Sequence, residues 1–135
     1  MPATYPALMV PDDIIYTYSR KQAVEDGFQV KLEGELADLA RQVYRYPVYI
    51  TGTVWAIIEK AVANKKHHND LKGVLWDILY MSTHASAPLD EQTRHFNVYI
   101  TGAGRRRKWY MYAKCGPTDF DDPAPAITIM FPDDD

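Results

Sequence analysis

A run of four basic residues followed by aromatic ones is the strongest chemical signal in this sequence. The run spans residues 105–108, and alternation along the predicted strand behind it places two tyrosines on the face opposite Trp109. Arginine and tyrosine anchor many protein interfaces, so we expect this surface to bind a protein partner. The candidate partner-binding residues are Arg105, Arg106, Arg107, Lys108, Tyr99, Tyr110 and Tyr112.

Two other interpretations of this surface stay open. Single-stranded nucleic acid binds to similar surfaces, where cations follow the phosphates and aromatic rings stack on the bases. A solubilising turn with cross-strand aromatic pairs is the purely structural alternative. The formal net charge of −3 disfavours general nucleic-acid binding, because that binding scales with the number of phosphates neutralised. Nucleic acid is therefore the alternative partner and protein the preferred one.

Acidic residues gather at the C-terminal end of the chain. No basic residue follows position 118, so the preceding part carries fifteen bases against twelve acids. A calcium loop needs alternating ligands and a well-placed glycine, and prolines stand where that glycine would be. We therefore expect a solvated acidic surface at Asp119, Asp121 and Asp122, followed by an acidic tail over residues 133–135.

Histidine and cysteine give weaker signals. His67 and Asp70 lie about one helical turn apart, but no second local pair completes a metal site. Cys115 is the single cysteine, and nucleophilic catalysis there needs the fold to bring His84 or His95 to it. A small enzyme that uses Cys115 or a histidine ranks third among the hypotheses. We expect no catalytic residue, no metal and no cofactor.

Length and composition are typical of one ordinary domain. The chain has 135 residues, 47% hydrophobic and 24% charged, which suffices for a core that needs no disulfide or metal. Its apolar runs are shorter than the ~18 residues of a membrane span, and its start lacks a signal-peptide pattern. We expect a cytoplasmic protein, a monomer or weak dimer, with no membrane partner.

Capping and periodicity predict the elements that position these side chains. Ser19 and Gln22 form a capping-box pattern, Gly27 offers a left-handed stop, and Asp70 is a good N-cap. After residue 95 apolar residues recur at every second position, which is typical of a strand and not of a helix. The segment over 116–125 is rich in proline and aspartate and predicts a loop. The predicted helices cover residues 20–26, 36–44, 51 or 53 to 62, and 70–80. The predicted strands cover residues 14–18, 28–32, 46–50, 96–100, 107–114 and 127–131, with a hairpin turn over 101–104.

This order of elements predicts a single α+β domain. We expect a largely antiparallel sheet with a C-terminal three-stranded meander and about four helices packed on one face. Residues 1–13 contain three prolines and form an irregular lead-in. Residues 14–132 form the domain, and residues 133–135 form the tail.

Five segments of the sequence carry a resemblance to known proteins. They cover residues 13–27, 46–51, 75–79, 114–119 and 127–130. Together they resemble a family of small uncharacterised proteins common on bacterial plasmids and integrated mobile elements. The resemblance implies no activity, but accessory genes on such elements often encode small inhibitors of host defence. We therefore expect a non-catalytic protein-binding module that modulates host defence or replication.

Overall fold

The computed structural model describes residues 18–134. The predicted lead-in over residues 1–13 and most of the predicted strand 14–18 lie outside this range. The helices are α2 (Arg20–Glu25), α3 (Gly34–Ala40), α4 (Gly52–Ala63), α5 (Leu71–His84) and the short 3-10 helix η1 (Pro132–Asp134). The strands are β1 (Gln29–Lys31), β2 (Val48–Thr51), β3 (Ala87–Pro88), β4 (Thr93–Tyr99), β5 (Lys108–Asp119) and β6 (Asp122–Met130).

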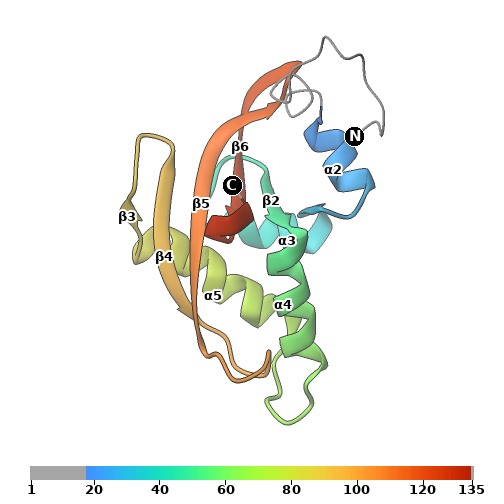
Figure 1. Ribbon diagram of the computed structural model, residues 1–135, viewed down its shortest axis with the longest axis vertical. Helices are drawn as coiled ribbons and strands as arrows, with labels where there is room; N and C mark the ends of the chain where they lie inside the picture. The colour runs from blue at the N-terminus through green and yellow to red at the C-terminus, as the bar shows by residue number, and fades with distance from the viewer. Residues whose placement is uncertain (1–17, 135) are drawn as a thin grey trace, which may run out of the picture.

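The strands form one six-stranded mixed sheet in the order β1-β2-β6-β5-β4-β3. Every neighbouring pair is antiparallel except β2 and β6, which run parallel, with Ile50 opposite Ile129. Strands β4, β5 and β6 form the predicted C-terminal meander (Figure 1). The predicted α+β class and the largely antiparallel sheet are therefore confirmed.

The local capping signals define helix starts as predicted. The Ser19 side chain accepts from the Gln22 backbone N–H, and the Gln22 side chain accepts from the Ser19 N–H, which completes the capping box of α2. Gly27 adopts a φ of 80°, the left-handed conformation that glycine tolerates best. Asp70 caps α5 through a bond from the Gly73 N–H.

The core lies between one face of the sheet and helices α4 and α5. Alternation along the strands turns Phe96, Val98 and Met111 toward this core, where each is at most 1% exposed. Ile58 of α4 and Leu75 of α5 are fully buried against the same cluster. Within residues 18–134, no helix combines the length and apolar character needed to cross a bilayer.

The segment over residues 116–125, predicted to be a loop, is a hairpin instead. Strand β5 continues to Asp119 and β6 begins at Asp122, so only Phe120 and Asp121 make the turn. This hairpin projects at one end of the sheet, beside α2 (Figure 1). The prediction was wrong because proline and aspartate are usually depleted in strands.

The register explains how the prolines fit into this hairpin. Pro117 lies opposite Pro125, two residues beyond the pair Cys115 and Ile127. The backbone N–H groups of Cys115 and Ile127 both donate away from the β5–β6 pair, to Gln92 and Pro47 respectively. Backbone N–H groups two residues apart on a strand point the same way. At Pro117 and Pro125 an N–H would therefore also point away from the partner strand, so its absence costs no hydrogen bond between β5 and β6.

The connection between β4 and β5 is longer than the predicted turn over 101–104. It runs over residues 100–107, and Gly102 and Gly104 adopt φ values of 93° and 106°. Asn69 donates to the Thr101 carbonyl at 2.7 Å and Asn64 donates to the Gly102 carbonyl at 3.2 Å. The connection between α4 and α5 therefore holds this loop in place (Figure 1).

Candidate binding surface and pocket

The structure places the predicted basic residues, Tyr99 and Tyr110 at the loop end of the β4–β5 pair, and Tyr112 further along β5 on the same face. We call Arg105, Arg106, Arg107, Lys108, Tyr99, Tyr110 and Tyr112 the basic–aromatic surface. In the register, Tyr99 lies opposite Lys108, and His95 lies opposite Tyr112. Because Trp109 and Met111 are buried in the core, the alternating Tyr110 and Tyr112 emerge on the other face of the sheet.

Much of this surface is open to solvent. The Tyr99 side chain is 67% exposed and Tyr110 is 39% exposed, and residues 105–108 are all exposed. The ion pairs found within residues 18–134 involve none of the four cations in the run. Arg106 differs from the others because its guanidinium lies over the Trp109 ring, 5.1 Å from the centroid. Arg105, Arg107 and Lys108 therefore keep their charge available for a partner.

The rings of the basic–aromatic surface form a contiguous cluster with one histidine. Tyr110 lies edge-on to Tyr112 at 5.7 Å and edge-on to His95 at 5.6 Å between centroids. Partial desolvation and the neighbouring Tyr112 raise the pKa of the Tyr110 phenol above its ordinary value. Tyr110 therefore stays a neutral hydroxyl at physiological pH and can donate or accept a hydrogen bond.

Of the three predicted acidic surface residues, Asp121 and Asp122 are exposed, whereas Asp119 is partly buried and binds a distant segment of the chain. The Asp119 carboxylate accepts from the backbone N–H groups of Arg20 and Lys21 at the start of α2. It accepts a third bond from the Phe120 N–H. Asp122 accepts from the Ala124 N–H, whereas Asp121 is exposed in the hairpin turn. Asp119 therefore fastens the N-terminus of α2 to the β5–β6 hairpin.

Arg20 makes the reciprocal connection from α2 to the sheet. Its Nε donates to the Thr118 carbonyl at 2.6 Å, and its Nη1 donates to Gln29 Oε1 at 3.0 Å and to Thr128 Oγ1 at 2.9 Å. The guanidinium also lies 4.2 Å from the centroid of the Tyr49 ring. Burial lowers the pKa of Arg20, and the neighbouring Tyr49 and Asp119 oppose that shift. The guanidinium stays protonated at neutral pH, because the ordinary pKa of arginine lies far above 7.

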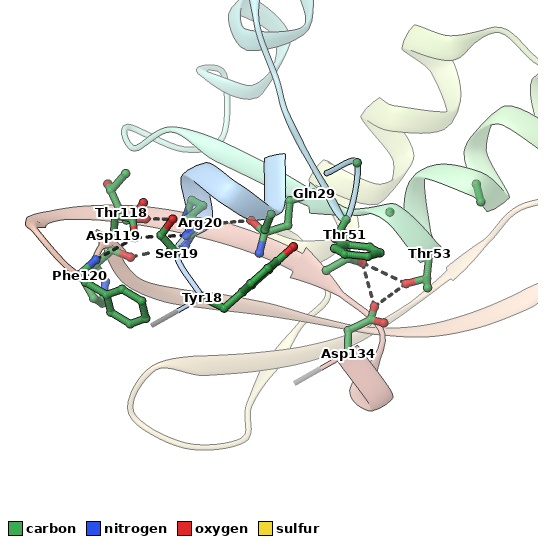
Figure 2. Close-up of a pocket in the computed structure, with 16 residues that line it drawn as sticks. Tyr18, Ser19, Arg20, Gln29, Thr51, Thr53, Thr118, Asp119, Phe120 and Asp134 are labelled. Carbon is green, nitrogen blue, oxygen red and sulfur yellow. Dashed lines mark hydrogen bonds between the residues drawn. The ribbon is translucent and has the colours of Figure 1, made fainter. Parts of the chain in front are cut away.

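Arg20 and Asp119 line the larger of two neighbouring hollows, a pocket of about 640 Å³ (Figure 2). Tyr18, Phe28 and Phe120 contribute aromatic side chains to its lining. Figure 2 shows Asp134 well separated from Arg20 and Asp119, with Tyr18 between them in that view. The pocket thus spans the space between the start of α2, the start of α4 and the β5–β6 hairpin.

Asp134, predicted to belong to a solvated tail, joins η1 to the start of α4. Its Oδ2 accepts from the Thr51 hydroxyl at 2.8 Å and from the Thr53 hydroxyl at 2.6 Å. The Phe131 N–H donates to the same oxygen at 2.9 Å. A carboxylate at a helix N-terminus is favoured by the helix dipole, so this contact stabilises α4 as well as the C-terminal turn.

We expect Asp119→Asn to lower the free energy of unfolding by about 1 kcal/mol at pH 7, because a charged hydrogen-bond acceptor is lost. Partial burial raises the pKa of Asp119, but three backbone N–H donors and the Arg20 charge outweigh burial and hold that pKa below its usual value. The stabilisation is therefore complete above about pH 3.9, the pKa of an aspartate in an unfolded chain. It is lost as the pH falls through the lower pKa of Asp119 in the folded protein.

Urea unfolding between pH 7 and pH 3 measures this effect. The difference between wild type and Asp119→Asn should be constant down to about pH 5 and should shrink below about pH 4. Asp121→Asn removes the same charge from an exposed turn position and is the matched control. A difference that stays constant across the whole pH range would contradict the capping role of the Asp119 carboxylate.

The structure does not assemble the cysteine and histidines into one site. Cys115 is half-buried against the core, whereas His95 lies on the opposite face of the sheet with Tyr110. His84 stacks on Tyr80 at the end of α5, with ring centroids 4.1 Å apart. Among the described residues, no group of three or more His, Cys, Asp or Glu is placed to hold a metal ion.

Sequence reasoning missed the connections made by Arg20, Asp119 and Asp134. Their partners are distant in the sequence, as the separation of 108 positions between Arg20 and Thr128 illustrates. Local patterns contain no signal for such pairs. The threonines at positions 51 and 53 indicated a helix start, but not the residue that would bind them.

Comparison with known proteins adds a family but no function. A model described as a family of unknown function (DUF6573) matches residues 7–135. No curated protein and no solved structure matches the chain significantly. The predicted resemblance to a family of uncharacterised proteins is thereby confirmed.

Proposed function

The chain belongs to this family of unknown function, and from its surface chemistry we propose a non-catalytic binding module that recognises an acidic protein. One observation carries the proposal. Arg105, Arg107 and Lys108 are exposed beside the tyrosine rings and form no ion pair with any residue in the 18–134 range. Asn64 and Asn69 hold the backbone of the 100–107 loop, so the cations are presented beside the tyrosine rings of the two strands.

A protein partner fits this surface for two physical reasons. Arginine and tyrosine are enriched among interface residues that contribute most binding energy, because each buries a large area with few rotatable bonds or several donors. Opposite charge on a partner also accelerates association and favours the correct orientation. The resemblance to proteins carried by mobile elements suggests a host protein of a defence or replication system as the partner.

Single-stranded nucleic acid is the second candidate, favoured by the exposure of Tyr99. This ring is 67% exposed on a strand of the sheet and lies directly opposite Lys108. Sheet surfaces that bind single strands combine such a ring, which stacks on a base, with a nearby cation for the phosphate. Binding of this kind weakens steeply as the salt concentration rises.

The test is a charge-removing variant, Arg105→Ser with Arg107→Ser and Lys108→Ser. Arg106 is kept because it covers the buried Trp109 ring. We expect capture from host lysate to recover one partner with wild type and at least about 100-fold less with the variant, as three charge-assisted contacts are lost. The matched control removes three exposed cations at the other end of the sheet, Lys31, Arg41 and Arg45.

The outcomes separate the two candidates. Recovery of the same partner by the charge-removing variant would contradict the proposed surface. A titration of the tyrosine and tryptophan fluorescence with a 20-nucleotide oligothymidine then tests the second candidate. Salt-dependent quenching that disappears in Tyr99→Ser and persists in the control would replace the protein proposal with nucleic-acid binding.

A further inference from the structure

The pocket beside α2 and α4 has aromatic walls and a carboxylate without a cationic partner. Phe28 is 64% exposed and Phe120 is 62% exposed, although both are large apolar side chains. Tyr18 lies beside Phe28, with ring centroids 6.3 Å apart and planes inclined by 49°. All three residues line the pocket, whose volume of about 640 Å³ lies within the usual range for small-molecule sites.

The charges lining this pocket are unequal. Within the described lining there are two carboxylates, Asp119 and Asp134, and one guanidinium, that of Arg20. Arg20 and Asp119 interact favourably with each other and are held by several further hydrogen bonds. Asp134, by contrast, forms no ion pair with any residue in the 18–134 range, although it shares a neighbouring hollow with Arg106.

The hydrogen bonds of Asp134 leave one oxygen available. All three donors to this side chain, from Thr51, Thr53 and Phe131, bind Oδ2. Oδ1 accepts no hydrogen bond from residues 18–134, and the side chain is exposed. Because Oδ2 is fixed by three donors, the carboxylate is oriented in advance, which lowers the entropy that a ligand must lose on binding.

We propose that this pocket binds a small organic cation, an ammonium group carried on an apolar body. The ammonium group donates to Asp134 Oδ1, and the apolar body lies against Phe28, Tyr18 and Ala56. Aromatic faces also attract cations, so these walls favour an ammonium over a neutral group of the same shape. None of the residues of the basic–aromatic surface lines this pocket, although Asp134 also borders a smaller hollow that Arg106 and Tyr110 of that surface line.

The test uses three probes that share a phenylethyl group and differ in charge. Phenylethylammonium is the cation, 3-phenylpropionate the anion and 2-phenylethanol the neutral compound, each titrated into the full chain at pH 7 by calorimetry and NMR. We expect the cation to bind at least about 10-fold more tightly than the other two. Equal binding of all three probes, or no binding of the cation at millimolar concentration, would overturn the proposal.

Two variants locate the bound cation. Asp134→Asn should weaken binding of phenylethylammonium at least about 10-fold, because the carboxylate that pairs with the ammonium group is removed. Asp133→Asn removes the same charge one residue away, where the side chain does not line this pocket, and should leave binding unchanged. Phe28→Ala, at an exposed position, should weaken binding several-fold without unfolding the chain. Weakening by Asp133→Asn equal to that by Asp134→Asn would show a diffuse charge effect and contradict the site.

Discussion

Replacing Arg20 by alanine is expected to lower the free energy of unfolding by roughly 3 kcal/mol, because Arg20 supplies several charge-assisted hydrogen bonds from a half-buried position. Its donors reach Thr118, Gln29 and Thr128, so one side chain connects α2 with β1, β5 and β6. Without the guanidinium, these acceptors lose their donor where water has limited access. For a chain of this size the melting temperature should fall by roughly 10 °C.

Thermal unfolding followed by circular dichroism measures this loss. Arg41→Ala is the matched control, since the Arg41 side chain is exposed and pairs only with Asp38 in the same helical region. Such exposed pairs contribute about 0.5 kcal/mol or less. Arg20→Lys should recover little of the loss, because an ammonium group cannot reproduce the planar array of donors. A melting temperature for Arg20→Ala within about 2 °C of wild type would show that α2 is held by other contacts.

Replacing Gly52 by valine is expected to destabilise the protein by about 3 kcal/mol through overpacking. Gly52 is the first residue of α4, and its N–H donates to the Phe28 carbonyl at 2.7 Å. A Cβ atom at this position would lie 2.7 Å from the Gly27 carbonyl oxygen and 3.4 Å from Phe28 Cα. Both neighbours are backbone, so neither can move aside without separating α4 from the end of α2.

Urea unfolding of Gly52→Val and Gly116→Val tests this packing. Gly116 is a strand residue where an added Cβ meets nothing within 4 Å. Gly116→Val is therefore expected to be neutral or slightly stabilising, because a side chain restricts the unfolded chain more than glycine does. Equal stabilities of the two variants would contradict the close approach of α4 to residues 27 and 28.

The two proposed binding sites differ in how they could be found. The run over residues 105–108 is visible in the sequence because its members are consecutive, and in the structure it is exposed, with residues 105–107 in the loop and Lys108 at the start of β5. The pocket has no such signal, because Tyr18, Phe28, Phe120 and Asp134 come from four separate parts of the chain. The folding of α2 against the β5–β6 hairpin and of η1 against the start of α4 brings them together.

Local interactions account for the elements that the sequence predicted. The capping box of Ser19 and Gln22 and the cap at Asp70 act over three residues, and the alternation over 96–100 reflects a strand with one buried face. These signals depend on neighbours in the chain and persist in any tertiary arrangement. They sufficed to predict the α+β class and the three-stranded meander.

Long-range contacts decided what the sequence left undetermined. The parallel pairing of β2 with β6 and the carboxylates at the starts of α2 and α4 join distant segments. The pairing of residues 116–119 with 122–125 is local, but it depends on a register that the sequence does not show. A proline is excluded from a strand only where its missing N–H would face a partner, and only the register reveals which way it faces. By itself the sequence determined the helices, the meander and the charged loop. The tertiary structure determined which acids are bonded within the fold and which of them line a pocket, because those bonds depend on distances that spacing along the chain does not specify.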